Sequence, residues 1–169
     1  MRYSCFDTAV LNSKRTLIGK PIDKTDHILL SALQDDARAS YAELGRRVGL
    51  TPPAVAERVR RLEQSGVISG YHAQVDLKKA GYGLVAFIRL SSAPELAKQL
   101  GRVAAETPEV LEFHHVTGTE GYILKAAARS IEHLESVIVR LLPYGQTTTS
   151  IVLSSPVTWR RVEIGESER

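Results

Sequence analysis

The first half of the chain carries apolar residues at helical spacing. Leu29, Leu30 and Leu33 share one face of a helix that we expect over residues 24–34. Asp26 lies near the start of this helix, where the positive end of the helix dipole favours an acidic side chain. The pattern therefore predicts an amphipathic helix at the beginning of the folded region.

A second, shorter helix is expected to begin after Ser40. Ser40 and Glu43 have the spacing of a capping box, in which each side chain accepts a hydrogen bond from a backbone N–H of the other residue. Gly49 ends this helix, and Thr51 followed by Pro52 marks the start of a third one. Because only a few residues separate the two helices, the spacing predicts a helix-turn-helix.

The third helix has a core side and a solvent side. Val55, Val59 and Leu62 recur at i, i+4 and i+7 and are expected in the core. The opposite side holds residues expected to face solvent, namely Pro53, Glu57, Arg60 and Gln64. Gly66 ends the helix, and residues 67–75 are expected to form a strand pair, or wing, that folds back on the helices.

The second half of the chain alternates between strand and helix patterns. Strands are expected over residues 84–91, 110–117, 122–128 and 147–154, and helices over residues 94–107 and 131–142. The order βαββαβ predicts a ferredoxin-like antiparallel sheet of four strands with both helices on one face. The fold class is therefore α+β. The uncovered sheet face needs a partner, and we expect a second copy of the chain to supply it, which gives a dimer.

These elements divide the chain into two domains and three connecting segments. We expect a flexible N-terminal tail at residues 1–20, a winged helix-turn-helix DNA-binding domain at 21–75, a hinge at 76–83, an effector-binding and oligomerisation domain at 84–158, and a C-terminal tail at 159–169. The N-terminal tail shows no sustained helix or strand period, so it is either flexible or lies upstream of the true start.

The net positive charge of the chain is weak evidence for nucleic-acid binding. The chain has 169 residues and a net charge of +3, but residues 1–20 hold the whole excess. Both predicted domains are balanced, so DNA binding has to be argued from local arrangement. No apolar run approaches the roughly 20 residues of a membrane-spanning helix. We expect a cytoplasmic, nucleoid-associated protein without a membrane partner, a secretory signal or a disulfide, since Cys5 is the single cysteine.

Five arginines concentrate on the second and third helices, at positions 46, 47, 58, 60 and 61. The third helix of a helix-turn-helix enters the major groove, while the start of the second helix meets the DNA backbone. The residues expected to contact double-stranded DNA are Ser40, Tyr41, Arg47, Thr51, Pro53, Ala54, Glu57, Arg58, Arg60 and Arg61. The alternative is a solvated charged face with intrahelical pairs such as Glu57 with Arg61.

Longer motifs resemble one family of regulators. They are Asp23-Lys24-Thr25-Asp26, Ser40-Tyr41-Ala42-Glu43-Leu44, Val48-Gly49-Leu50-Thr51-Pro52, Glu57-Arg58-Val59-Arg60-Arg61-Leu62-Glu63, Val116-Thr117-Gly118 and Tyr122-Ile123-Leu124-Lys125. Over residues 22–158 the chain resembles the Lrp/AsnC (feast/famine) transcriptional regulators. The resemblance implies a winged helix-turn-helix, dimers that assemble into tetramers, octamers or larger discs, and an amino acid or related metabolite bound between dimers. The two-fold symmetry of a dimer predicts a pseudo-palindromic operator.

The expected effector site centres on the glycine-flanked loop of the second domain. Its residues are Gly118, Thr119, Glu120, Gly121 and Tyr122, with Thr147 and Thr149 of the last strand. Backbone N–H groups of such a loop can receive a carboxylate, and Glu120 can accept from an amino group. The alternative is a tight hairpin turn that needs glycine. Many family members carry acidic residues where this chain has Thr119 and Gly121, which leaves altered specificity, or loss of the ligand, open.

Two other function classes remain as alternatives. Some relatives with this architecture are enzymes, the sirohaem decarboxylases, and His114 with His115 raises that question. Adjacent strand residues point to opposite faces, so at most one of them serves a given pocket. No phosphate loop, dinucleotide motif or nucleophile elbow is present. We therefore expect no enzyme activity and no cofactor or metal. An interaction protein without DNA specificity is the third possibility.

Overall fold

The computed structural model describes residues 22–164, which form two compact units. The helical unit contains residues 22–73 together with 157–164, and the sheet unit contains residues 74–156. The chain thus passes between the units twice, once in each direction. The segment expected as a C-terminal tail therefore begins inside the helical unit, which the sequence patterns did not indicate.

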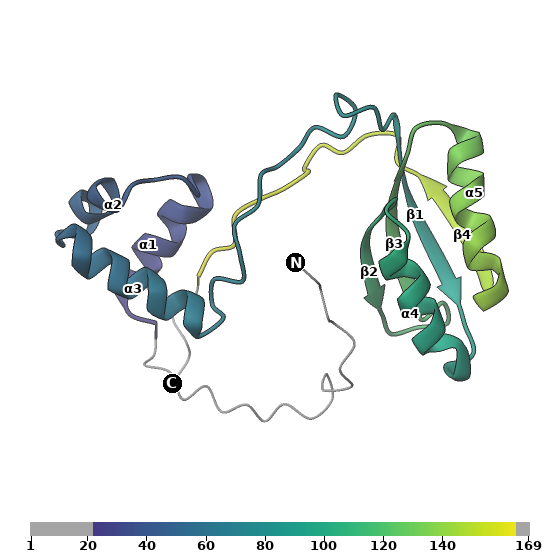
Figure 1. Cartoon of the computed structure of the whole chain (residues 1–169), viewed down its shortest axis with the longest axis horizontal. Helices are drawn as coiled ribbons and strands as arrows, with labels where there is room; N and C mark the ends of the chain where they lie inside the picture. The colour runs from purple at the N-terminus through teal and green to yellow at the C-terminus, as the bar shows by residue number, and fades with distance from the viewer. Residues whose placement is uncertain (1–21, 165–169) are drawn as a thin grey trace. The chain divides into compact units, whose positions relative to one another are not determined.

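The helical unit consists of α1 (Lys24–Asp35), α2 (Tyr41–Val48) and α3 (Pro52–Gln64) (Figure 1). The predicted capping box of Ser40 and Glu43 is confirmed, and Asp23 and Asp26 form a second one at the start of α1. Buried apolar side chains from all three helices pack together as a small core, made by Leu29, Ala32, Leu44, Val55 and Val59. The predicted helix-turn-helix is therefore confirmed.

Two glycines make the turn between α2 and α3 possible. Gly49 ends α2 in the left-handed region, at φ 68° and ψ 32°. A Cβ at Gly45 would collide with the carbonyl oxygen of Leu50, so a residue larger than glycine does not fit at this position. The backbone N–H of Leu50 donates to the Gly45 carbonyl at 3.0 Å. The turn is therefore tight because its own backbone at Leu50 folds back onto α2 at Gly45.

The expected wing is not formed within the described range. Residues 67–75 contain no strand in the structure. Only Ile68 packs against the helical core, and the residues around it are mostly exposed. A strand needs a neighbouring strand to pair its backbone groups, and this segment has none among residues 22–164. The strand-pair prediction for residues 67–75 is wrong in the described chain.

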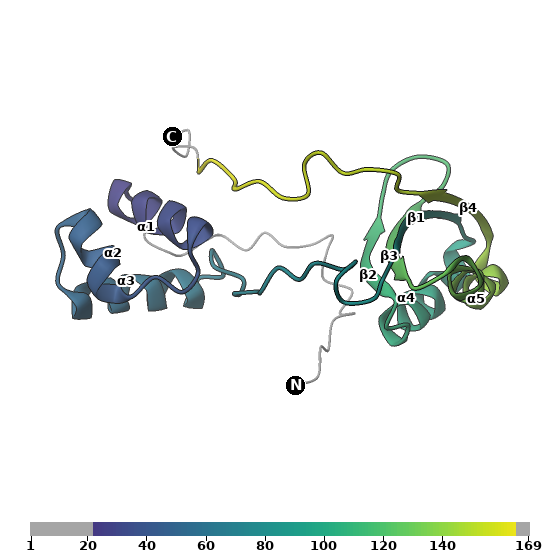
Figure 2. The ribbon, with the colours of Figure 1, turned by 90° about the horizontal axis from the view of Figure 1, so that it is seen from above.

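The sheet unit contains four strands and two main helices. They are β1 (Leu84–Ser91), α4 (Ala97–Glu106), β2 (Val110–His115), β3 (Tyr122–Ala128), α5 (Ile131–Leu141) and β4 (Gln146–Ile151). Short 3₁₀ turns, η1 (Pro94–Leu96) and η2 (Leu142–Tyr144), precede α4 and follow α5. The antiparallel order is β2-β3-β1-β4, and both helices cover the same face (Figure 2). The ferredoxin-like prediction is confirmed.

Alternation along the strands decides which side chains enter the core. Ile88 and Leu90 of β1 and Leu124 of β3 are fully buried beneath the helices, against Leu100 of α4 and Val137 of α5. Two predicted strands extend too far, because the structure ends them at His115 and Ile151. The expected helix at 94–107 begins as a 3₁₀ turn and becomes α-helical only from residue 97.

The other sheet face carries the intervening residues. Phe87 and Arg89 of β1 lie on it beside Ile123 and Lys125 of β3. Phe87 remains 39% exposed, although it is a large apolar side chain. No helix among the described residues is long and apolar enough to cross a membrane.

Candidate nucleic-acid interface

The start of α3 presents small, neutral residues to solvent. Thr51 occupies the N-cap position, and Pro52 and Pro53 follow as exposed residues. Ala54 is half-buried and Glu57, one turn further on, is exposed. Since small residues allow the helix backbone to approach closely, this end of α3 is suited to the floor of a DNA groove.

Basic side chains flank this tip. Arg46 and Arg47 lie in the last turn of α2 and are exposed. The guanidinium of Arg60 on α3 contacts the Glu57 carboxylate at 2.7 Å, and both side chains remain more than half exposed. An exposed pair at this spacing contributes little to stability, because solvent screens it. Arg60 is thus held by Glu57, about two turns after the helix start, in a position that solvent reaches.

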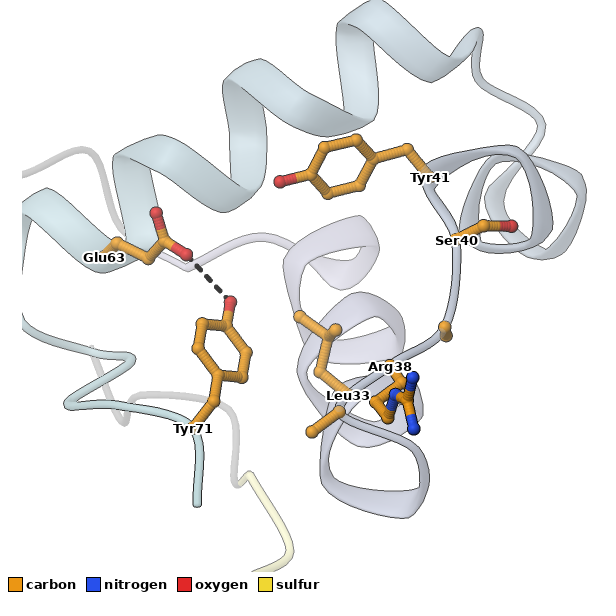
Figure 3. Close-up of a pocket in the computed structure, with 8 residues that line it drawn as sticks. Leu33, Arg38, Ser40, Tyr41, Glu63 and Tyr71 are labelled. Carbon is orange, nitrogen blue, oxygen red and sulfur yellow. Dashed lines mark hydrogen bonds between the residues drawn. The ribbon is translucent and has the colours of Figure 1, made fainter. Parts of the chain in front are cut away.

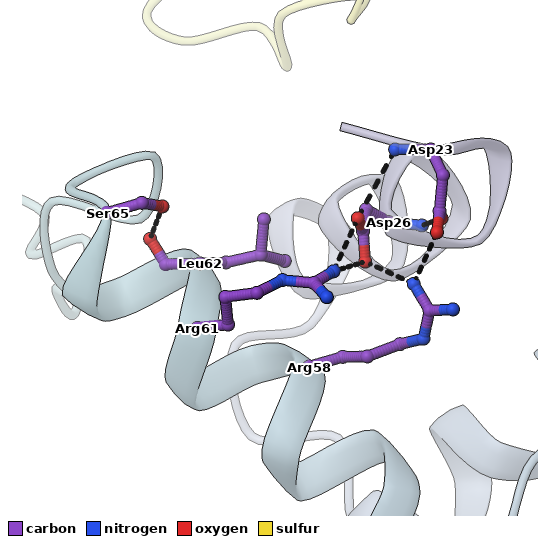
Figure 4. A network of polar contacts seen from close by, with 6 residues as sticks. All are labelled: Asp23, Asp26, Arg58, Arg61, Leu62 and Ser65. Atoms are coloured by element: carbon purple, nitrogen blue, oxygen red, sulfur yellow. Dashed lines mark hydrogen bonds and ion pairs between the residues drawn. The ribbon is translucent and has the colours of Figure 1, made fainter. Parts of the chain in front are cut away.

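Arg58 and Arg61 turn towards α1 instead of solvent (Figure 4). The Arg58 Nη1 donates to Asp23 at 2.7 Å and to Asp26 at 2.8 Å. The Arg61 Nη2 donates to Asp26 at 2.8 Å. The intrahelical pair of Glu57 with Arg61, given above as an alternative to DNA contact, does not form, because Glu57 pairs with Arg60 and Arg61 pairs with Asp26.

The burial of Asp26 explains this arrangement. Its side chain is only 2% exposed, and an unpaired carboxylate at such a site is costly. Two arginines from α3 surround it, while the Asp23 backbone N–H adds a third donor at 3.2 Å. The hydrogen bond from Arg58 also holds the pKa of Asp23 below its ordinary value, although burial opposes this. The cluster therefore fixes α3 against α1.

The start of α2 borders a cavity that sequence reasoning missed. The cavity has a volume of about 320 Å³ and lies between the end of α1, Tyr41, Glu63 and Tyr71 (Figure 3). The Tyr71 hydroxyl donates to the Glu63 carboxylate at 2.9 Å. Burial, with this carboxylate adding to it, raises the pKa of Tyr71 to about 12. The Ser40 hydroxyl donates a hydrogen bond to the Glu43 carboxylate at 2.8 Å. The neighbouring Tyr41 side chain is 45% exposed and so is open to a further contact.

The loop expected to bind an effector is a tight turn between β2 and β3. Gly118 and Gly121 have φ angles of 113° and 69°, which favour glycine. The Val116 N–H donates to the Gly121 carbonyl at 2.7 Å. Thr119 at the tip is exposed, and Glu120 is half-buried. The geometry explains both glycines as parts of a hairpin turn.

The Glu120 carboxylate has a partner that the sequence did not indicate. It pairs with the Arg89 guanidinium of β1 at 3.2 Å, and Arg89 also donates to the Ser150 hydroxyl of β4 at 3.2 Å. The signal in the sequence was a single cationic residue within the apolar strand at residues 84–91. These three polar groups join the loop to β1 and β4 on the uncovered face of the sheet.

The remaining candidate effector residues lie on the other face. Thr147 pairs with Leu90 and Thr149 with Ile88, both of which point into the core beneath the helices. The Tyr122 ring also packs against that core and stacks on His115, with ring centroids 4.9 Å apart. The structure therefore separates Thr147, Thr149 and Tyr122 from the pair formed by Glu120 and Arg89.

The histidines do not gather into a reaction centre. His114 and His115 are register partners of Ile123 and Tyr122, so they point to opposite sheet faces. His114 contacts Glu112 at 3.3 Å, and His133 contacts Glu109 at 2.9 Å. No group of three metal-ligating side chains occurs among residues 22–164.

Comparison with known proteins defines the class of this molecule. An AsnC-type helix-turn-helix domain matches residues 22–63, and an Lrp/AsnC ligand-binding domain matches residues 85–162. A helix-turn-helix followed by a ferredoxin-like ligand-binding domain is a transcriptional regulator architecture. The chain belongs to the Lrp/AsnC family of transcriptional regulators.

Individual relatives agree with this assignment. The chain is 40% identical over 134 residues to the HTH-type transcriptional regulator YezC of Bacillus subtilis, covering 79% of this chain and 95% of the relative. The structure of LrpC from B. subtilis superposes with a TM-score of 0.78 at 32% identity, covering 83% of this chain and all of LrpC. A feast or famine regulatory protein of Mycobacterium tuberculosis, solved with L-methionine, gives a TM-score of 0.80 at 32% identity over 85% of this chain and 99% of its own.

Proposed function

We propose that this regulator reads double-stranded DNA with the N-terminal end of α3 and fixes itself to the phosphates with exposed arginines. The proposal rests on the different positions of the three arginines of α3. Arg58 and Arg61 hold α3 against α1, while Arg60 stays more than half exposed further along the same helix, paired with Glu57. A rigidly held helix loses little freedom on binding, which favours affinity.

The candidate contacts fall into two groups. Pro53, Ala54 and Glu57 face the base edges, where Glu57 can accept from a cytosine amino group. The groups assigned to phosphates are Ser40, Tyr41, Arg47, Thr51 and Arg60. Arg58 and Arg61 leave this primary set, since their guanidiniums already neutralise Asp23 and Asp26. Their remaining N–H groups contribute at the edge of the interface.

Salt-dependent DNA binding tests the phosphate contacts. Arg47→Ala with Arg60→Ala should weaken binding to selected genomic fragments and reduce the slope of log K against log salt by about two, because each phosphate contact contributes about 0.9. Fluorescence anisotropy of labelled duplexes at several salt concentrations measures this slope. Arg102→Ala, an exposed arginine on α4, is the matched control and should leave the slope unchanged. Equal slopes for all three proteins would remove the assigned face.

We also propose that the particle is built from dimers. A dimer through the uncovered sheet face buries Phe87 and presents two α3 helices, which calls for a pseudo-palindromic operator with half-sites about one helical turn, or a multiple, apart. Octamers or similar assemblies follow from the family resemblance. Sedimentation of the full chain with and without duplex DNA measures both stoichiometries.

The proposed effector is an amino acid or a related small metabolite near the turn at Gly118–Gly121. The L-methionine complex of the mycobacterial relative supports this class of ligand. The pair formed by Glu120 and Arg89 supplies one acceptor and one donor for a zwitterion. A thermal-shift screen of the common amino acids tests it, since a ligand at about 100 times its Kd stabilises by about 2.7 kcal/mol. No shift with any of them at millimolar concentration would contradict an amino acid effector.

We propose that the chain has no catalytic activity of its own. The two adjacent histidines that raised the enzyme alternative point to opposite faces of β2. The purified protein should show no porphyrin absorbance and should not decarboxylate a sirohaem-type substrate. Absorbance of that kind together with turnover would favour the enzyme.

A further inference from the structure

The segment that follows β4 returns to the helical unit and contacts α1. The backbone N–H of Val162 donates to the Gln34 Oε1 at 2.8 Å, and the Gln34 Nε2 donates to the Val162 carbonyl at 3.2 Å. One side-chain amide thus satisfies both backbone groups of one residue, as a neighbouring strand does in a sheet. This pairing selects an extended backbone at a defined register.

An ion pair lies beside the amide pairing. The Arg161 guanidinium contacts the Asp35 carboxylate at 3.2 Å. In the described chain the last turn of α1 holds no basic residue, so the negative end of its dipole lacks a cation from the helix itself. Arg161, which lies 126 positions after Asp35 in the sequence, supplies that cation. The two hydrogen bonds of Gln34 fix the register of the segment. The ion pair of Arg161 with Asp35 is half exposed, so its attraction is weak and is reduced further by salt.

We propose that the C-terminal end of α1 is a docking site for the extended backbone of residues 160–162, and that this contact makes the segment a second tether of the DNA-binding unit. The first connection, from Ile68 to the start of β1 at Leu84, reaches about 55 Å when fully extended. The segment from the end of β4 at Ile151 to Arg161 reaches only about 35 Å. The docked segment is therefore the shorter of the two restraints on α1.

The tether begins at β4, which Arg89 of β1 links to the candidate effector loop. Ser150 of β4 accepts from Arg89, and Arg89 pairs with Glu120 in the loop. The Val152 N–H then donates to the Val85 carbonyl at 2.8 Å, which holds the root of the segment on β1.

The docking is tested without DNA or effector. Trp159 is the single tryptophan of the chain, so its fluorescence reports on the segment alone. In the full-length protein, Gln34→Ala should speed hydrogen exchange at the Val162 amide at least about fivefold and increase the fast component of the Trp159 anisotropy decay, because two hydrogen bonds are lost. Gln99→Ala, an exposed glutamine on α4, should change neither signal. Unchanged exchange and anisotropy in Gln34→Ala would overturn the docking site.

Charge reversal provides an independent variant. Asp35→Arg alone and Arg161→Asp alone should each loosen Trp159, and the double variant should restore the wild-type anisotropy decay at low salt. Restoration should fade as salt rises, since the pair is exposed. A double variant as loose as the single ones would show that Arg161 and Asp35 do not pair in solution.

The effect of the tether on DNA rests on the proposed function. Two α3 helices bind two half-sites at once only when the helices are held at a fixed spacing. Loosening the DNA-binding unit should therefore lower the affinity for a duplex with two half-sites but hardly change the affinity for a single half-site. Gln34→Ala should weaken binding to a duplex with two half-sites by about tenfold and to a single half-site by less than about twofold. If the wild type binds no DNA, the proposed function fails while the docking result stands. If docking is lost and both affinities are unchanged, the tether has no such role.

Discussion

At the scale of single residues, the helical unit depends on the chemistry of one buried carboxylate. Asp26 accepts from Arg58, from Arg61 and from a backbone N–H, which satisfies its charge inside a small core. The same two arginines had been expected to face DNA. Their position shows that a basic residue on a recognition helix can act by holding that helix in place.

Removing this carboxylate should be severe. Asp26→Ala leaves Arg61 without its counter-ion and leaves Arg58 with Asp23 alone, so we expect a loss of about 3 kcal/mol in the free energy of unfolding of the helical unit. Urea denaturation followed by far-UV circular dichroism measures it. Glu135→Ala, an exposed carboxylate on α5, serves as the control and should change stability by less than about 0.5 kcal/mol. Equal midpoints for the two variants would contradict the role of Asp26.

A second carboxylate links stability to pH. The hydrogen bond from His133 holds the pKa of Glu109 below its ordinary value of 4.5, with burial opposing and Arg140 assisting. Because the folded pKa is depressed, the contribution of Glu109 is present above pH 4.5 and is lost as pH falls through the lower folded value. Unfolding free energy measured from neutral to acidic pH should therefore decline below pH 4.5, and Glu109→Gln should flatten that decline. An identical acid profile for the variant would argue against this linkage.

At the scale of elements, helix starts and strand alternation could be predicted because they depend on neighbours in sequence. The capping box at Ser40, the stop at Gly49 and the order βαββαβ are all confirmed. The strand pair at residues 67–75 was wrong, because strand formation needs a partner that the described chain does not bring there. Propensity alone identifies a segment that can be extended, but the presence of a neighbouring strand decides whether it pairs.

The helix-turn-helix itself gives a prediction of unusual sign. Alanine normally stabilises a helix relative to glycine by about 1 kcal/mol. At Gly45 the added Cβ meets the Leu50 carbonyl, so Gly45→Ala should destabilise the unit by about 1–3 kcal/mol and weaken DNA binding as the turn opens. Thermal denaturation monitored by circular dichroism gives the sign directly. A raised melting temperature would show that the turn at Leu50 does not approach Gly45 as closely as the structure indicates.

At the scale of the whole molecule, the uncovered sheet face is the surface that the proposed dimer uses. The face mixes apolar and charged groups, with Phe87 exposed between strands that carry Arg89 and Lys125. In the proposed dimer, a second copy covers this face, and each copy contributes the same surface to the contact.

Disrupting that face should dissociate the particle. Phe87→Asp removes apolar burial and places a charge in the interface, so we expect dimer association to weaken by at least about 2 kcal/mol. Analytical ultracentrifugation at micromolar protein measures the shift towards monomer. Val139→Asp, at a residue 55% exposed on α5, is the control and should leave the dimer intact. If both variants sediment as the wild type does, the dimer forms through another surface.

The sequence by itself predicted most of the elements, their order and the class of protein, because caps, periodicity and family motifs act over a few neighbouring residues. Tertiary structure decided what those residues do. Arg58 and Arg61 donate to Asp26, which is 32 and 35 residues away from them in the sequence. Glu120 was joined to Arg89 but kept from Thr147 and Thr149 by the strand register. Gln34 paired with Val162 across 128 residues. Such contacts depend on which faces meet once the chain is folded, and no local pattern encodes that choice.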